Sequence, residues 1–311
     1  MMKQKLIVVA GSTASGKTAA AVELCRRMNG EVVSADSMQL YRGMEILSAA
    51  PGMEERRGVP HHMIGVAEPS EKYSAAKYRD LAREVIADVA ARGRLPVLCG
   101  GTGLYIDAVT RAMAFSETCD ESLRRELLRI AEEPDGRRRL HDMLRGIDPE
   151  AADRLHENDV RRVSRAIEVF RLTGRTQREQ MEADRRREGD YDETLFCLDW
   201  RREMLYQRID RRVDAMLEAG LVEEVSRLKA DACAHPTALQ AIGYKEIAAA
   251  LEGGISMESA VELVKRLSRN YAKKQMTWFR RDPRTVWIEA EGKSAAQIAG
   301  EMAADLKEKY K

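Results

Sequence analysis

The sequence predicts an α/β fold in which helices flank a parallel sheet and a helical insertion interrupts the chain. Short apolar runs alternate with amphipathic helical segments in residues 1–115 and again in 191–311, which is the pattern of a parallel sheet. Strand signals vanish in 116–190, where charge rises and helical segments are separated by Pro and Gly breaks. We therefore expect an α/β core domain built from the two outer segments and a helical insertion domain between them.

A glycine-rich stretch, GSTASGKT at 11–18, follows the first apolar run at 6–10 and precedes a helical segment. It has the spacing of a phosphate-binding loop, with four residues between two glycines and then a Lys and a hydroxyl residue. Its backbone N–H groups and the helix start favour anions, so we predict a P-loop NTPase-like sheet that binds a polyphosphate, with Thr18 helping to hold Mg²⁺. The loop alone does not distinguish a nucleoside triphosphate from an isoprenoid diphosphate. The predicted loop residues are Gly11, Ser12, Thr13, Ala14, Ser15, Gly16, Lys17 and Thr18.

The next apolar run, at 31–34, predicts a second strand, and Asp36 follows its end. Parallel sheets bind ligands at this edge, although an isolated Asp after a strand more often caps a turn. The polar residues around Asp36 favour a role in ligand binding over a role as a cap. His61 and His62 are adjacent and point apart, which favours a structural or substrate-orienting role over metal binding.

An amphipathic helix at 74–92 leads to a buried strand at 95–99 and then to a second glycine-rich turn, Gly100-Gly101-Thr102-Gly103. The turn could simply be a tight start to the helix that follows. Two glycine-rich turns at one edge of one sheet would, however, lie close together. Thr102 is therefore a candidate for a second hydroxyl group at the phosphates.

The middle segment contains two helices that we expect at 123–130 and 159–172. Arginine runs at 137–139 and 185–187 are interpreted as solvated faces. Three further arginines share the 159–172 helix with an apolar face, so at least part of this set must project from the helix. They are Arg161, Arg162 and Arg165.

The last part of the chain predicts a strand at 194–198, a helix at 204–219, a helix at 256–281, and a final strand at 285–289 before a terminal helix. Basic side chains lie along one side of the 256–281 helix, with aromatic residues interleaved. This combination suits a single-stranded nucleic acid, whose phosphates need neutralising and whose bases can stack. The basic residues are Arg266, Arg269, Lys273 and Arg280, and the aromatic ones are Tyr271, Trp278 and Phe279.

The composition limits the compartment and the kind of partner. The chain has 52 Lys and Arg and 51 Asp and Glu, a formal net charge of +1, so any nucleic-acid site must be local. Five scattered cysteines without a CxxC pair argue against a disulfide framework or a zinc module. No leader with a cleavage site precedes the first strand, and no apolar stretch approaches bilayer length. We expect a soluble, cytoplasmic protein with no membrane partner.

Ordered blocks along nearly the whole chain resemble the bacterial tRNA dimethylallyltransferases, also called tRNA isopentenyltransferases. These blocks are GSTASGKT, SADSMQLYRGM, HHMI, LPVLCGGTGLYI, DVRRVSRAIEVFRLTG, LDWRREMLYQRIDRRVDAML, QAIGYKE and YAKKQMTWFRR. The family usually has Pro where this chain has Ser12, which leaves the loop spacing intact. It usually has Gly-Thr-Ala-Lys-Pro where this chain has LSAAP at 47–51, so the Lys and the Thr of that segment are missing here.

The resemblance implies transfer of a dimethylallyl group from dimethylallyl diphosphate to the N6 amine of adenosine 37 in tRNA, with Mg²⁺ and release of diphosphate. We expect Asp36 to be the general base, Arg212 and Lys17 to stabilise the leaving diphosphate, and Thr102 to donate to its bridging oxygen. The adenine must leave its stack to reach the site. We expect a monomer whose C-terminal helices contact tRNA. The expected tRNA contacts are Ser37, Met38, Gln39, Arg161, Arg162, Arg165, Gln240, Gly243, Tyr244, Lys245, Arg269, Lys273, Lys274 and Arg280.

Three other functions remain as alternatives. A small-molecule or nucleotide kinase shares the phosphate-binding loop and would turn over ATP, but it has no need of a basic aromatic helix. An adenylate isopentenyltransferase acting on free AMP or ATP keeps the chemistry, and the RNA-facing blocks argue against it. A non-catalytic RNA-binding module has no need of Asp36 and Thr102 beside a phosphate-binding loop.

Overall fold

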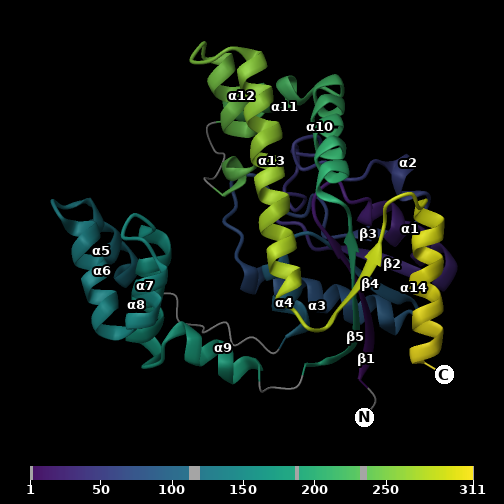
Figure 1. Ribbon diagram of the computed structural model, residues 1–311, viewed down its shortest axis with the longest axis horizontal. Helices are drawn as coiled ribbons and strands as arrows, with labels where there is room; N and C mark the ends of the chain where they lie inside the picture. The colour runs from purple at the N-terminus through teal and green to yellow at the C-terminus, as the bar shows by residue number, and fades with distance from the viewer. Residues whose placement is uncertain (1–2, 112–119, 186–188, 232–236, 311) are drawn as a thin grey trace. The chain divides into compact units, whose positions relative to one another are not determined.

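The computed structural model describes residues 3–111, 120–185, 189–231 and 237–310. The chain divides into two compact units (Figure 1). The first comprises Met1–Thr110 and Asp190–Lys311, and the second comprises Arg111–Gly189. Among the helices that the structure describes, none combines the length and the apolar character needed to cross a bilayer.

The first unit is built on one sheet, in which the described residues form six parallel strands in the order β3-β2-β4-β1-β5-β6. The central strand β1 pairs with β4 on one side and β5 on the other, so that Gly11 lies opposite Leu198. The strands are β1 (Gln4–Gly11), β2 (Gly30–Ser34), β3 (His61–His62), β4 (Leu95–Gly100), β5 (Tyr191–Asp199) and β6 (Thr285–Glu289). The predicted P-loop NTPase-like parallel sheet flanked by helices is confirmed.

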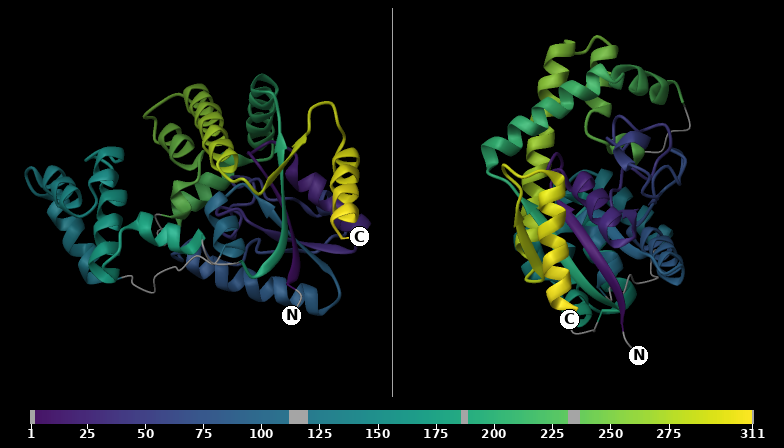
Figure 2. Two further views of the ribbon diagram at one scale, coloured as in Figure 1. Left: turned by 60° about the horizontal axis from the view of Figure 1, so that its bottom comes forward. Right: turned by 90° about the vertical axis from the view of Figure 1, so that its right-hand side faces the viewer.

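Alternation of side chains along β1 divides the core between the two faces of this sheet. Ile7 and Val9 pack with the helix after β1 and with the C-terminal helix, whereas Leu6 and Val8 belong to the cluster on the other face. Figures 1 and 2 show the C-terminal helix α14 beside α1. The helices of this unit are α1 (Lys17–Met28), α2 (Met53–Arg56), α3 (Ala75–Ala91), α4 (Gly103–Thr110), α10 (Arg202–Glu218), α11 (Leu221–Ala230), α12 (Tyr244–Leu251), α13 (Met257–Arg280) and α14 (Ala295–Lys309), with a 3₁₀ turn at Ala238–Gln240.

Serine side chains begin three of these helices by accepting a hydrogen bond from a free backbone N–H group of the first turn. Ser74 does so for α3, Ser256 for α13 and Ser294 for α14. The sequence-based boundaries at 74–92 and 256–281 therefore agree with the structure to within one residue at each end.

The second unit is helical in its described residues. Its helices are α5 (Glu121–Glu132), α6 (Gly136–Ile147), α7 (Pro149–Arg154), α8 (Val160–Thr173) and α9 (Gln177–Arg185). Leu127, Leu140, Val163 and Ile167 are fully buried in its core. The helices predicted at 123–130 and 159–172 correspond to α5 and α8. The arginine run at 137–139 is exposed as expected, and the run at 185–187 falls largely outside the described residues.

Candidate functional site

The loop at 11–18 joins β1 to α1, so the predicted strand, loop and helix are confirmed. Glycine is required at two of its positions. Gly16 has a φ of 88°, in the left-handed region, and a Cβ on Gly11 would lie 2.7 Å from the Oγ of Ser15. The Nζ of Lys17 donates to the carbonyl oxygen of Ser12 at 3.3 Å, which folds the lysine back over the loop.

Trp200 and Arg208, which follow β5 in the chain, donate hydrogen bonds to two backbone carbonyl groups of the loop. The Nε1 of Trp200 donates to the carbonyl oxygen of Ser15 at 2.9 Å, and the Nε of Arg208 donates to that of Ala14 at 2.8 Å. The guanidinium of Arg208 also lies over the Trp200 ring, 4.4 Å from its centroid. Because these carbonyl groups are satisfied by donors, their dipoles do not oppose an anion on the loop.

A cavity of about 1660 Å³ opens beside the loop. It is lined by the loop, by the segment after β2, by 45–51, and by the facing sides of α10 and α13. The predicted loop residues that line it are Thr13, Ala14, Gly16, Lys17 and Thr18, whereas Gly11, Ser12 and Ser15 are buried. The structure therefore brings the predicted loop, Asp36 and Arg212 together at one cavity.

Two cations, Lys17 and Arg212, face this cavity. Lys17 is only 9% exposed, and burial lowers its pKa, as does the charge of Arg212 nearby. Burial also lowers the pKa of Arg212, whose guanidinium donates to the Thr13 hydroxyl at 3.1 Å. Neither cation forms an ion pair with a carboxylate in the described part of the chain. Two close, partly desolvated cations form a site for an anion of high charge.

Asp36 lies at the carboxyl end of β2 and lines the cavity. Its Oδ1 accepts a hydrogen bond from the backbone N–H of Met38 at 3.0 Å, so it does cap the turn. Its negative charge acts on both Lys17 and Arg212 and raises the pKa of each. Its other oxygen accepts no hydrogen bond from the described residues, so a carboxylate oxygen remains for a ligand.

Thr102 ties the second glycine-rich turn to the segment that carries Asp36. Its Oγ1 accepts from the backbone N–H of Ser37 at 3.1 Å, and its own N–H donates to the carbonyl oxygen of Ala35 at 3.1 Å. A Cβ on Gly100 would lie 2.1 Å from that same carbonyl oxygen, which explains the glycine. Thr102 stands behind Ser37 and is not among the cavity-lining residues.

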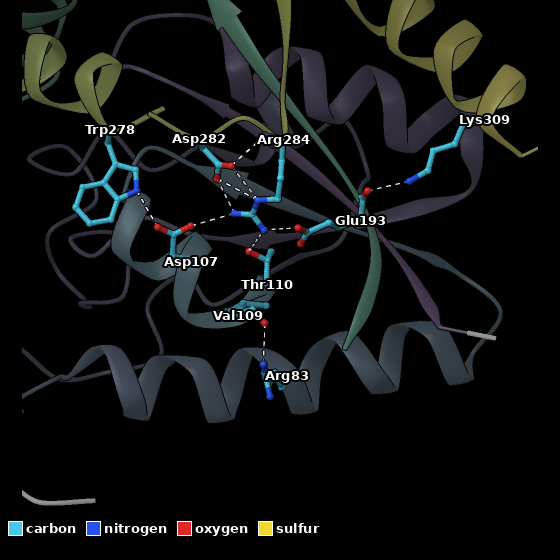
Figure 3. Close-up of polar contacts among 9 residues, drawn as sticks. All are labelled: Arg83, Asp107, Val109, Thr110, Glu193, Trp278, Asp282, Arg284 and Lys309. Atoms are coloured by element: carbon cyan, nitrogen blue, oxygen red, sulfur yellow. Dashed lines mark hydrogen bonds and ion pairs between the residues drawn. The ribbon is translucent and has the colours of Figure 1, made fainter. Parts of the chain in front are cut away.

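The three aromatic residues of α13 differ in exposure: Tyr271 and Trp278 are exposed, whereas Phe279 is buried. Phe279 is 2% exposed in the core, so the sequence-based interpretation is wrong for this residue. The indole Nε1 of Trp278 donates to Asp107 at 3.0 Å, and Asp107 in turn pairs with Arg284 (Figure 3). A helical stripe shows which side chains share a face, and tertiary packing decides which face is covered.

The residues expected to contact tRNA fall into three groups. Those that line the cavity are Ser37, Met38, Gln39, Gln240, Lys273 and Lys274. Those that belong to the first unit without lining it are Gly243, Tyr244, Lys245, Arg269 and Arg280. Within the second unit, Arg161 and Arg162 are exposed on α8, whereas Arg165 pairs with the buried Glu168 at 2.8 Å. Arg269 pairs with Asp210 of α10 at 2.5 Å, so it also holds two helices together.

Sequence reasoning missed four residues that shape the site: Trp200, Arg208, Glu224 and Gln275. The buried carboxylate of Glu224 accepts from the N–H groups of the cavity segment at 46 and 47, and Gln275 lies between the two glycine-rich turns. A signal for Gln275 was present, because it is a polar residue among the apolar positions of the buried face of α13.

His61 and His62 form β3 and make local contacts. His62 hydrogen-bonds the buried Glu31 through Nε2 at 2.8 Å, and the Nδ1 of His61 contacts the carbonyl oxygen of Val59 at 2.9 Å. No group of three or more His, Cys, Asp or Glu side chains that could hold a metal occurs within the described residues. Hydroxyl and carboxylate oxygens line the cavity, among them the Thr18 hydroxyl next to Lys17. Hard donors of this kind fit a magnesium ion that takes its remaining ligands from a substrate phosphate and water.

Comparisons with known proteins agree on one family. Residues 39–282 match the family model described as IPP transferase. The tRNA dimethylallyltransferase of Geobacter metallireducens is 47% identical over 294 residues, covering 94% of each chain. The crystal structure of the tRNA isopentenylpyrophosphate transferase from Bacillus halodurans aligns with a TM-score of 0.74 and 42% identity, over 99% of this chain and 98% of that chain. A eukaryotic dimethylallyltransferase acting on tRNA aligns with a TM-score of 0.81 and 29% identity, over 98% of this chain and 80% of that chain.

Proposed function

This chain belongs to the IPP transferase family, and from that premise we propose that it transfers a dimethylallyl group to tRNA. The donor is dimethylallyl diphosphate, the acceptor is the N6 amine of adenosine 37, and diphosphate is released. One observation of the site carries the proposal: Lys17 and Arg212 lie close together beside a phosphate-binding loop, and neither forms an ion pair with a described carboxylate. A diphosphate would supply the close negative charge that this pair can bind.

The leaving group is stabilised by the loop and the two cations. As the bond between C1 of the dimethylallyl group and the diphosphate oxygen breaks, its electron pair goes to that oxygen. Lys17, Arg212 and the N–H groups of the loop are positioned before the reaction, so little reorganisation is needed when this charge develops. We propose that Thr102, which stands behind Ser37, donates to the bridging oxygen.

The acceptor amine is a weak nucleophile, because its lone pair is delocalised into the adenine ring. As the N6–C1 bond forms, the amine must lose a proton, and Asp36 is the base that we propose for it. Its hydrogen bond to the Met38 N–H fixes Oδ1 and leaves the other oxygen for the amine. The same negative charge helps to balance Lys17 and Arg212 before the donor binds.

Proteins of this family use a prenyl diphosphate with a divalent metal ion, and we propose that the ion here is Mg²⁺. Bound to the diphosphate, it would neutralise part of the charge on the leaving oxygens. Thr18 is the residue that would hold it, since it lines the cavity next to Lys17.

We propose that tRNA lies against the exposed cations of α13, chiefly Lys273 and Lys274, with Ser37, Met38 and Gln39 lining the path of the flipped adenine. The core domain at 1–115 and 191–311 would carry the chemistry and the C-terminal RNA-contacting helices. The insertion domain at 116–190 would add the α8 arginines. Because its proposed substrate is tRNA, we propose a cytoplasmic location. We also propose that the protein acts as a monomer.

The test is an acceptor competition. The protein is incubated with labelled dimethylallyl diphosphate and Mg²⁺, with either unmodified tRNA or AMP as acceptor. Label on tRNA supports the proposal, and label on AMP alone would identify an adenylate isopentenyltransferase. ATP turnover at about one per second or faster, without prenyl transfer, would identify a kinase.

A further inference from the structure

Gln275 on α13 bridges the two glycine-rich turns of the site. Its Oε1 accepts a hydrogen bond from the backbone N–H of Thr13 at 2.9 Å, and its Nε2 donates to the carbonyl oxygen of Gly101 at 2.9 Å. The side chain is 6% exposed, so these bonds are largely shielded from water. The pairing of β1 with β4 places these two turns side by side, and one buried amide bridges the phosphate-binding loop and the turn that carries Thr102.

The glycines of the second turn are explained by α13. A Cβ on Gly101 would lie 2.2 Å from the Nε2 of Gln275, and one on Gly103 would lie 2.4 Å from the Trp278 ring. Neither glycine has a positive φ in this structure, so close approach of these side chains, not backbone strain, requires glycine at both positions. The turn is shaped to receive the helix.

Tyr271 lies one turn before Gln275 on the same face of α13. It lines the cavity, and burial raises its pKa to about 12. Gln275 and Trp278, at the next turns of the helix, lie against Gly101 and Gly103.

The helix that carries Gln275 is fixed at both ends. Toward its start, Lys265 and Arg269 pair with Asp214 and Asp210 of α10, at 2.7 and 2.5 Å. Toward its end, Trp278 is held by Asp107, within the network that surrounds Arg284 (Figure 3). α13 is therefore a rigid support for Gln275, as a positioning residue requires.

We propose that Gln275 is a positioning residue that holds the phosphate-binding loop and the Thr102 turn at the separation the diphosphate needs. This inference rests on the proposed function. An amide of this length is suited to the task, because it accepts at one loop and donates at the other. Asn is one methylene shorter, and a carboxylate cannot donate to Gly101.

Three variants separate positioning from packing. Gln275→Met keeps the length of the side chain and removes both hydrogen bonds. Gln275→Glu keeps an acceptor for the Thr13 N–H, but the ionised carboxylate has no donor for Gly101. Gln207→Met is the matched control, since Gln207 is exposed on α10 and does not line the cavity. Each protein is titrated with inorganic diphosphate and with tRNA, melted, and assayed in a single turnover at saturating tRNA.

We expect Gln275→Met to weaken diphosphate binding about tenfold and to slow prenyl transfer about tenfold to a hundredfold, at nearly unchanged tRNA affinity. For Gln275→Glu, the rate relative to the natural protein should rise as pH falls, because the protonated carboxyl group regains a donor. Because both proteins share every other titrating group, this ratio isolates the effect of the side chain at position 275. Gln207→Met should match the natural protein throughout.

Two results would overturn the inference. If Gln275→Met melts earlier but keeps its diphosphate affinity and its single-turnover rate, the residue merely packs α13. If tRNA affinity falls while the rate at saturation is normal, Gln275 is an RNA contact. A natural protein that binds diphosphate without prenylating tRNA would overturn the proposed function alone, because the diphosphate titration still decides the role of Gln275.

Discussion

Glu224 and Leu47 are 177 residues apart in the chain, yet the Glu224 carboxylate accepts a hydrogen bond from the Leu47 N–H at 2.7 Å. Its second oxygen accepts from the N–H of Ile46 at 3.0 Å. This buried carboxylate on α11 therefore fixes the 45–51 segment, which lines the cavity. Residues 47–51 of this segment stand where the family usually has Gly-Thr-Ala-Lys-Pro.

Glu224→Gln should destabilise the protein, because an amide offers one acceptor and turns an NH₂ group toward the other N–H. Leaving one buried N–H unsatisfied costs about 1–3 kcal/mol, which urea denaturation would measure. Glu223→Gln, the exposed neighbour, is the control. Equal stability of the two variants would mean that the 45–51 segment does not depend on this carboxylate.

Lys17→Met should abolish prenyl transfer without destabilising the protein. Burial and the nearby Arg212 lower the pKa of Lys17, so the folded protein without ligand gains nothing from this charge. Diphosphate should raise the melting temperature of the natural protein and not that of the variant. Retained transfer, or a diphosphate-induced shift of equal size, would remove Lys17 from the donor site.

Asp36→Asn should slow the chemical step about a hundredfold to ten-thousandfold, because the amide cannot take up a proton. The Asn oxygen can still accept from the Met38 N–H, so the turn and the melting temperature should change little. Single-turnover kinetics are run beside a melting curve. A destabilised variant with a normal rate would show that Asp36 only caps the turn.

Lys273→Ala combined with Lys274→Ala should weaken tRNA binding and reduce the log–log salt slope by about two units, one for each lost phosphate contact. Both residues are exposed at the cavity. Arg269→Ala is a contrasting variant, since Arg269 pairs with Asp210 and its loss should mainly loosen α13 from α10. An unchanged slope for the double variant would make this side of α13 an ordinary solvated face.

Stability should fall in acid because of Glu31, which is buried and hydrogen-bonded to Arg92. The Arg92 guanidinium, together with His62, holds the pKa of this carboxyl at about 2. The unfolded chain titrates near pH 4.3, so the stabilisation is present above that pH and is lost as pH falls toward 2. When Glu31 is fully ionised, this interaction adds about 3 kcal/mol to the free energy of unfolding. Urea midpoints at pH 7 and pH 3 should differ less in Glu31→Gln than in the natural protein, and an equal difference would contradict this.

The sequence was sufficient for the sheet, for the phosphate-binding loop and for the position of Asp36, because spacing along the chain determines these features. It could not identify the partners of Gln275 or Glu224, which lie far away in sequence, although the polar Gln275 on the apolar face of α13 is a signal that can be read. The periodicity of α13 correctly predicted which residues share a side. It could not predict that Phe279 is buried or that Arg269 is paired, because those outcomes depend on α10 and the sheet.

The bond between Thr13 and Gln275 joins residues 262 positions apart, and the one between Thr13 and Arg212 spans 199 positions. During synthesis the phosphate-binding loop therefore leaves the ribosome long before the side chains that complete it. A nascent chain that ends before Arg212 has the loop without its arginine, and one that ends before Gln275 lacks the amide that bridges the two turns. Contacts of such long range also make folding slow, since the ends of large loops must meet before any stabilisation is gained. The proposed donor site is therefore complete only after nearly the whole chain has been synthesised.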